Sequence, residues 1–107
     1  MVEGEVPTSW YSVRCVVKHG ANGYEERVTL WHSDGFASAI AKAEDEAQSY
    51  AEDVGNAEYV GLAQAFQIAG EPEEGAEVFS LIRESNLSAK DYLSRFFDTG
   101  DELQGQT

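Results

Sequence analysis

The feature that most constrains the fold is a turn signal between two strand-like runs near the start of the chain. Residues 10–19 and 24–32 are rich in Val, Thr, Tyr and Trp, which favour β-strands. Between them stands Gly20-Ala21-Asn22-Gly23, and Asn-Gly is a dipeptide that tight hairpin turns prefer. The two runs are therefore predicted to pair as an antiparallel hairpin.

The faces of this hairpin follow from the loop length. A loop of two residues and a loop of four give the facing pairs the same parity, so either length assigns the same faces. On this basis the core face carries Tyr11, Val13, Cys15 and Val17 beside Val28 and Leu30. The opposite face then carries Trp10, Arg14, Lys18, Arg27 and Trp31, with Ser12, Val16, Glu25 and Thr29 among them. Both tryptophans are thus predicted on one face.

An amphipathic helix is predicted after the hairpin. Ser33-Asp34-Gly35 offers an N-cap, and apolar residues then recur at helical spacing from Phe36 through Asp53. The apolar stripe is mostly alanine, which allows a helix to approach a sheet closely. Gly55-Asn56 is a typical helix end.

A second pair of strands is predicted over residues 58–68 and 76–85, joined by the acidic, turn-forming segment 69–75. One face of this pair holds Val60, Leu62, Phe66, Ile68, Val78 and Ile82. The other holds Tyr59, Gly61, Ala63, Ala65, Phe79 and Leu81, so both faces are apolar. Such a sheet needs cover on both sides, from its own helices or from another subunit.

A short helix is predicted to close the domain. Ser88 and Asp91 form a capping pair, and Tyr92, Leu93 and Phe96 follow before a stop ahead of Gly100. The order is therefore ββαββα. We expect an α+β fold, with a four-stranded, mainly antiparallel sheet of two hairpins, one long amphipathic helix and one short C-terminal helix. Residues 9–100 form a single domain in this interpretation, and residues 1–8 and 101–107 form flexible tails.

Several of these segments resemble a family of small, mainly bacterial domains that is described only as a domain of unknown function. The segments are Trp10-Tyr11-Ser12-Val13-Arg14, Glu25-Glu26-Arg27-Val28-Thr29-Leu30-Trp31, Glu58-Tyr59-Val60-Gly61-Leu62-Ala63-Gln64-Ala65, Glu77-Val78-Phe79-Ser80-Leu81-Ile82-Arg83 and Tyr92-Leu93-Ser94-Arg95-Phe96-Phe97-Asp98-Thr99-Gly100. The resemblance implies a stand-alone domain, and it brings no activity, cofactor or site residue with it.

The charge is strongly negative and unevenly distributed. Seven bases against 20 acids give a formal net charge of −13. Residues 43–82 hold ten acids and no Lys or Arg, namely Glu44, Asp45, Glu46, Glu52, Asp53, Glu58, Glu71, Glu73, Glu74 and Glu77. Such a field repels nucleic acid and anionic membrane and steers basic partners. An alternative interpretation is that these acids only keep the protein in solution, and the sequence leaves both interpretations open.

The residues that commonly carry chemistry do not converge. His19 lies at the turn end of the predicted hairpin and His32 at its open end. At ~3.3 Å per residue the two are about 26 Å apart, so they cannot share a metal ion. Cys15 is predicted as a buried, inert thiol. Neighbouring Glu25 and Glu26 point to opposite faces of a strand and cannot act as a carboxylate pair. We expect no enzyme activity, no metal and no cofactor.

The sequence favours a non-enzymatic, acidic protein-binding module that docks a basic protein surface, in the manner of immunity proteins, nuclease inhibitors or nucleic-acid mimics. The predicted contacts are Glu44, Asp45, Glu46, Glu52, Asp53, Glu71, Glu73 and Glu74. One alternative is a self-associating structural domain that forms a homodimer. Another is a small anion or metabolite site on Trp10, Arg14, Lys18, Arg27 and Trp31, unless the short helix covers that face. The single cysteine and the acidic, leaderless N-terminus favour a cytoplasmic location.

Overall fold

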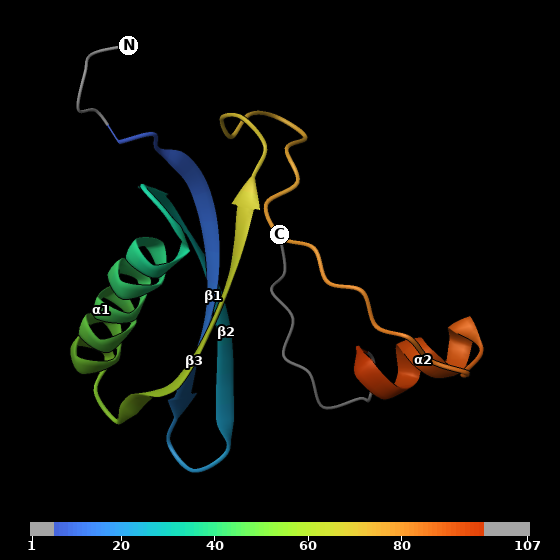
Figure 1. Cartoon of the computed structure of the whole chain (residues 1–107). Coiled ribbons are helices and arrows are strands. Elements are labelled where there is room, and N and C mark those ends of the chain that lie inside the picture. Colours follow the sequence, from blue (N-terminus) through green and yellow to red (C-terminus); the bar gives the residue numbers. More distant parts are fainter. Residues whose placement is uncertain (1–5, 98–107) are drawn as a thin grey trace.

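The computed structural model describes residues 6–97 of the chain, and these form an α+β fold of one three-stranded antiparallel sheet and two helices. The elements are β1 (Ser9–His19), β2 (Gly23–Ser33), α1 (Phe36–Val54), β3 (Ala57–Ile68) and α2 (Ala89–Phe96). The strand order is β2-β1-β3, so the first strand lies in the centre of the sheet. Helix α1 covers one face of the sheet, and α2 lies apart from it (Figure 1).

The first hairpin forms, but with a loop that reverses one predicted face. β1 and β2 pair from Ser9 opposite Ser33 to His19 opposite Gly23, which leaves a loop of three residues. An odd loop shifts the register by one residue, and a shift of one turns every side chain of the second strand over. The prediction for the faces of β2 was therefore wrong. Gly20 begins the loop with φ +59° and donates its N–H to the carbonyl of Asn56 at 2.9 Å.

A stripe of alanines brings α1 close to the sheet. Its buried residues are Ala39, Ala43, Ala47 and Ala51, which are at most 3% exposed. They belong with Tyr11, Val13 and Cys15 to the core between helix and sheet. Gly35, one of the three residues predicted to offer the cap, occupies the N-cap position of α1, and no described side chain makes a capping hydrogen bond there. The predicted end is confirmed, because Gly55 at φ +77° closes the last turn on Ala51.

The predicted fourth strand was wrong. Residues 76–85 form no strand in the described part of the chain, so the order is ββαβα. The reason lies in the path of the chain after β3. Ser12 in central β1 holds the carbonyl of Val78, which places this segment over the sheet and not along the edge of β3. β3 also carries an irregularity opposite residues 15–17, where Gly61 has φ +87°, and such bulges discourage further pairing at an edge.

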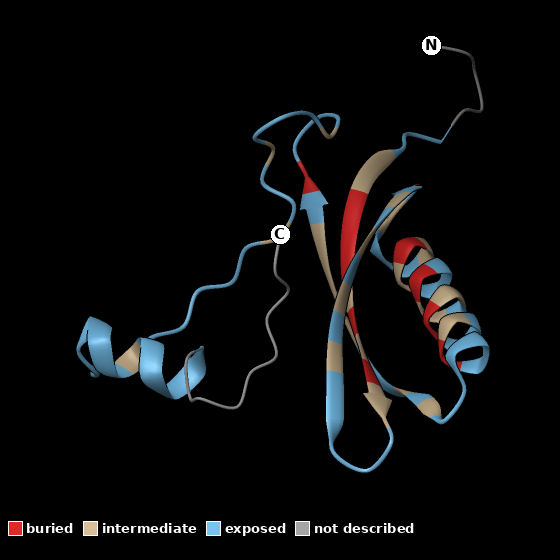
Figure 2. Ribbon diagram, turned by 180° about the vertical axis from the view of Figure 1, so that it is seen from behind, coloured by how far each residue is buried: buried red, intermediate tan, exposed pale blue. Residues whose placement is uncertain are grey.

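Most of the buried residues belong to the core between the sheet and α1, and the last third of the described chain is mostly exposed (Figure 2). Ser88 caps α2 as predicted, since its hydroxyl accepts the N–H of Asp91 at 3.2 Å. Neither described helix is long and apolar enough to cross a membrane. Residues 6–8 are exposed; the rest of the predicted N-terminal tail, the predicted tail 101–107 and residues 98–100 lie outside the described residues.

Candidate interaction surface

The face of the sheet that α1 leaves uncovered is an exposed apolar surface, which we call the open face. Its principal side chains are Tyr24, Val28 and Leu30 of β2 and Val60 and Leu62 of β3. Each is between 42% and 64% exposed. The hairpin register puts the three β2 residues opposite Lys18, Arg14 and Ser12. The two β3 residues alternate with Tyr59 and Ala63, which pack against the core, and therefore point the other way.

Arg14 holds the centre of the open face together. Its guanidinium donates to Oε1 of Gln64 through Nε at 3.1 Å and also through a second nitrogen. It pairs with the Glu26 carboxylate at 3.3 Å and lies 4.8 Å from the ring centroid of Phe79. A planar, permanently charged group of this kind binds an acid, an amide and an aromatic ring at once. Arg14 therefore links all three strands of the sheet to the segment that follows β3.

That segment, residues 76–97, we call the C-terminal arm. It touches the open face only at its beginning, where the Ser12 hydroxyl donates to the Val78 carbonyl and Phe79 lies 6.4 Å from Phe66, centroid to centroid. Beyond this anchor every described residue of the arm except Tyr92 is exposed. Within the described residues, α2 packs against no strand and no other helix. The arm thus covers a small part of the open face and leaves most of it in solvent.

On the opposite side of the sheet, side-chain hydrogen bonds join α1 to β2 along one flank of the helix and to β3 along the other. Arg27 of β2 makes two bonds to the Glu46 carboxylate, at 2.7 and 3.0 Å. Its guanidinium also lies 3.8 Å from the ring centroid of Tyr50. On the other flank the Tyr59 hydroxyl of β3 donates to Glu44 at 2.5 Å. Acids of the helix therefore hold it in place on the sheet.

The ionisation of this side reflects its bonds. The hydrogen bond with His19, at 2.8 Å, lowers the pKa of Glu25, and a bond from Tyr50, also at 2.8 Å, acts in the same direction. The bond to Glu46 raises the pKa of Arg27. Burial, followed by the bond to Glu44, raises the pKa of Tyr59. Each shift favours the ordinary charge state of its group at neutral pH.

The eight acids predicted as partner contacts do not form one surface. Glu44 and Glu46 are half-buried and bonded to the sheet, so they are not free for a partner. Asp45, Glu52, Asp53, Glu71, Glu73 and Glu74 are exposed. The helix acids and the loop acids are separated by the sheet. Glu52 lies beside the start of β3 and Glu71 beyond its end, and a strand of 12 residues spans roughly 40 Å.

The predicted Trp/Arg set is also divided. Trp10, Arg14 and Lys18 lie on the open face, whereas Arg27 and Trp31 lie on the side of α1, opposite Cys15 and Tyr11. The premise of one shared face was wrong, because it depended on an even loop. Trp31 packs against the core and donates its indole N–H to Thr29 at 2.7 Å. No pocket between Arg14, Arg27 and Trp31 is therefore compatible with the register.

Sequence reasoning missed the open face for the same reason. It assigned Val28 and Leu30 to the core and gave Tyr24 no role, whereas the register exposes all three. The signal that could have found them is the loop itself, since a glycine at each end allows three loop residues as readily as two. The apolar character of both faces of 58–68 was the second signal.

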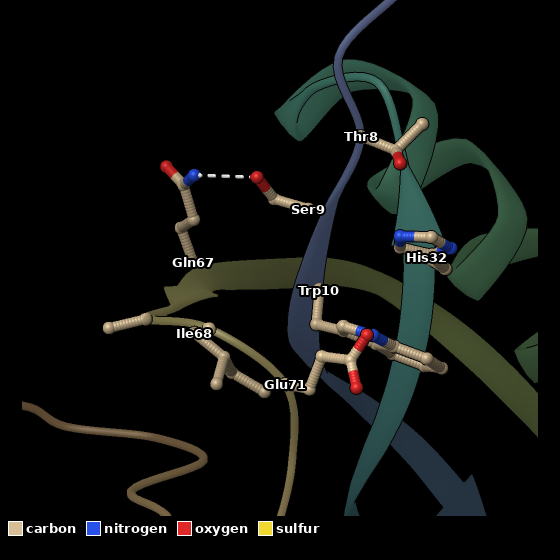
Figure 3. A pocket seen from close by; sticks show the side chains of 9 residues that line it. Thr8, Ser9, Trp10, His32, Gln67, Ile68 and Glu71 are labelled. Carbon is tan, nitrogen blue, oxygen red and sulfur yellow. Dashed lines mark hydrogen bonds between the residues drawn. The ribbon is translucent and has the colours of Figure 1, made fainter. Parts of the chain in front are cut away.

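A hollow of about 460 Å³ lies at the end of the sheet where β1 begins and where β2 and β3 end. Trp10 and His32 stack there with centroids 4.9 Å apart, and Gln67 donates to the Ser9 hydroxyl at 3.1 Å (Figure 3). The charged group in its lining is the acid Glu71, and no Lys or Arg contributes. This lining does not favour an anionic ligand.

The groups that carry chemistry remain apart in the structure. His19 pairs with Glu25 at one end of the sheet, and His32 stacks on Trp10 at the other. Cys15 is buried, as predicted, and burial raises the pKa of its thiol. Among residues 6–97, no three His, Cys, Asp or Glu side chains are grouped to hold a metal ion.

Comparison with known proteins finds no protein-family model, no curated protein sequence and no solved structure that matches this chain. The resemblance to a domain of unknown function therefore stays a prediction. What can be said of function has to come from the surfaces of the molecule itself.

Proposed function

We propose that this chain is a non-enzymatic protein-binding module that docks through the open face of its sheet. The observation that carries the proposal is two groups of exposed apolar side chains, contributed by β2 and β3 on either side of Arg14, which the described chain leaves uncovered. The solvated face of an antiparallel sheet is normally polar, whereas this one carries the exposed side chains of Val28, Leu30, Val60 and Leu62. Large exposed apolar patches on a soluble domain are typical of binding surfaces.

The polar residues of the open face support a protein partner in particular. Arg14 sits at its middle and is already held by Gln64 and Glu26, so its charge is paired and some of its N–H groups are bonded before a partner docks. Tyr24 lies at the rim with its ring beside Lys18. Arg and aromatic side chains next to exposed apolar residues are residue types that are enriched at protein interfaces.

The test is site-specific photo-crosslinking in the cell that makes the protein. A benzophenone amino acid replaces Val28 or Val60 on the open face, and in a matched control it replaces Ala21 in the exposed hairpin loop. We expect covalent adducts of discrete mass from both open-face positions and none from Ala21. The proposal is overturned if neither open-face position gives an adduct, or if adducts form equally often from Ala21.

Docking of a basic partner by the exposed acids of α1 is the second candidate. The observation that favours it is the last turn of the helix, where Glu52 and Asp53 stand and no basic residue does. Acids at a helix C-terminus oppose the helix dipole and cost stability, so they point to a use other than folding. Such docking would resemble that of immunity proteins, nuclease inhibitors or nucleic-acid mimics.

The same crosslinker placed at Asp45, on the exposed side of α1, tests this second candidate in a cell lysate, where the salt concentration can be set before illumination. We expect its adduct to disappear as the salt concentration is raised to about 0.5 M, because the attraction is screened over a few ångströms there. An adduct that persists, or one that survives reversal of Glu52 and Asp53 to Lys, would refute docking by charge.

A further inference from the structure

The C-terminal arm carries apolar side chains that its own fold does not use. They are Leu81, Ile82, Leu87, Leu93, Phe96 and Phe97, which are between 40% and 87% exposed. In α2 the ring of Tyr92 lies 4.7 Å from that of Phe96, centroid to centroid, and the Arg83 guanidinium lies 5.3 Å from the Phe96 ring. The short helix thus presents an aromatic surface that no other described helix or strand of its own chain contacts.

The arm and the open face are both electrically balanced, in contrast to the rest of the chain. Residues 76–97 hold three bases and three acids, so their charge is 3 − 3 = 0. The open face sets Arg14 and Lys18 against Glu26 and Glu58, which is again zero. The whole chain carries −13. These are therefore two surfaces that can be buried against each other without bringing net like charge together.

Together the two surfaces of one chain are large enough for a specific interface. At their measured exposure, the six arm residues and the five apolar residues of the open face leave on the order of 1,000 Å² accessible. One partner of a stable protein interface contributes about 800 Å². Mutual burial of arm and face would therefore meet the size of a specific interface.

The path of the chain indicates whether the arm covers the open face of its own copy or that of a second copy. The arm is fixed to its own sheet at Val78 and Phe79, near the middle of β1, and from there it runs away from the sheet (Figures 1 and 2). The arm leaves Val60, Leu62 and Tyr24 of the open face exposed. A two-fold axis lets the arm of each copy cover the face of the other, and such an arrangement closes at two copies.

We propose that two copies of this chain exchange their C-terminal arms, so that residues 80–97 of each copy pack on the open face of the other. This inference rests on the proposed function and names the occupant of its docking surface. Because each chain is strongly acidic, the two copies repel each other over a distance, and the dimer tightens as salt is added. Docking of a basic partner has the opposite salt dependence.

Sedimentation equilibrium of the full chain from 1 to 100 µM is the first test. We expect a mass twice the 11.7 kDa of one chain, with a dissociation constant that falls at least fivefold between low and high salt. Ile82→Arg changes a side chain that is 87% exposed, so it spares the fold, and it should return the protein to a monomer. The control Ala21→Arg should remain dimeric. A monomer at every concentration, or a dimer indifferent to Ile82→Arg, overturns arm exchange.

A disulfide experiment distinguishes exchange from closure of the arm on its own sheet. One chain carries Val60→Cys and the other Ile82→Cys, and the two are mixed and oxidised. Exchange predicts disulfide-linked heterodimers, whereas closure within one chain predicts a bond only in the double variant and none in the mixture. If the chain is monomeric but Val28 and Val60 crosslink to a different protein, the proposed function stands and arm exchange fails. If no adduct forms, both fail.

Discussion

Substitution of Ala47 by Leu tests the packing on which the fold depends. Ala47 is 0% exposed and lies in the middle of the alanine stripe that faces the sheet. A leucine adds three heavy atoms within the core cluster that Ala47 shares with Val13 and Cys15. The core has little room to give, because protein interiors are packed as densely as organic crystals. The helix must therefore move outward or the side chain must adopt a strained rotamer.

The cost has two parts. Overpacking of a core costs about 1–3 kcal/mol in the free energy of unfolding. An outward shift of about 1 Å also takes the Arg27–Glu46 bonds, now 2.7 and 3.0 Å, beyond hydrogen-bonding distance, and it does the same to the bond from Tyr59 to Glu44. Those bonds are partly exposed, so together they add roughly 1 kcal/mol. The expected loss is about 3 kcal/mol, or a fall of roughly 15 °C in Tm.

Urea unfolding followed by far-UV circular dichroism measures this loss. The matched control is Ala41→Leu, which makes the same change on the exposed side of the same helix. It should stay within about 0.5 kcal/mol of the parent protein. If Ala47→Leu is as stable as Ala41→Leu, the alanine stripe is not in close contact with the sheet, and the account of the core given above is refuted.

Three further outcomes follow from side chains with unusual surroundings. Ser33→Ala should raise the free energy of unfolding by up to about 1 kcal/mol, because its buried hydroxyl has no hydrogen-bond partner among the described residues; a loss would mean that Ser33 caps α1. Glu52→Lys should stabilise by about 0.5 kcal/mol at low salt, and the gain should fade in 1 M salt, since it replaces an acid in the last turn of α1. Glu25 has a lowered pKa, so its bonds to His19 and Tyr50 stabilise the fold above the unfolded value near pH 4.3 and are lost as the pH falls through the folded value. Glu25→Gln should flatten the decline of Tm with falling pH in that range, and unchanged slopes would contradict the assignment.

The elements that local chemistry determines were predictable from the sequence. Strand residues flanking a glycine-rich turn produced the first hairpin, and the hydroxyl of Ser88 capped α2 on Asp91. Gly55 ended α1 because a positive φ is open to glycine. Each of these depends on residues a few positions apart, so a single sequence contains the whole cause.

The elements that depend on geometry between distant residues were not predictable. One extra residue in the loop 20–22 reversed the side chains of β2, which moved Arg27 to the helix side and Leu30 to the open face. The residues 76–85 have a strand-like composition, but strand pairing needs a free, regular edge, and the irregularity at Gly61 disrupts the edge of β3. A pattern of residue types contains neither piece of information.

The acidic charge acquires a physical role once the surfaces are compared. Glu25, Glu44 and Glu46 belong to the helix–sheet contact, so the acidity of the sequence is partly a matter of internal bonding. The exposed acids of α1 and of residues 71–74 lie outside the open face, whose apolar side chains would otherwise favour indiscriminate aggregation. Repulsion between copies of charge −13 suppresses contacts of random orientation, because most orientations bring acid against acid. If the arm of one copy packs on the open face of the other, that approach avoids the repulsion, and the charge would then favour this mode of association over the others.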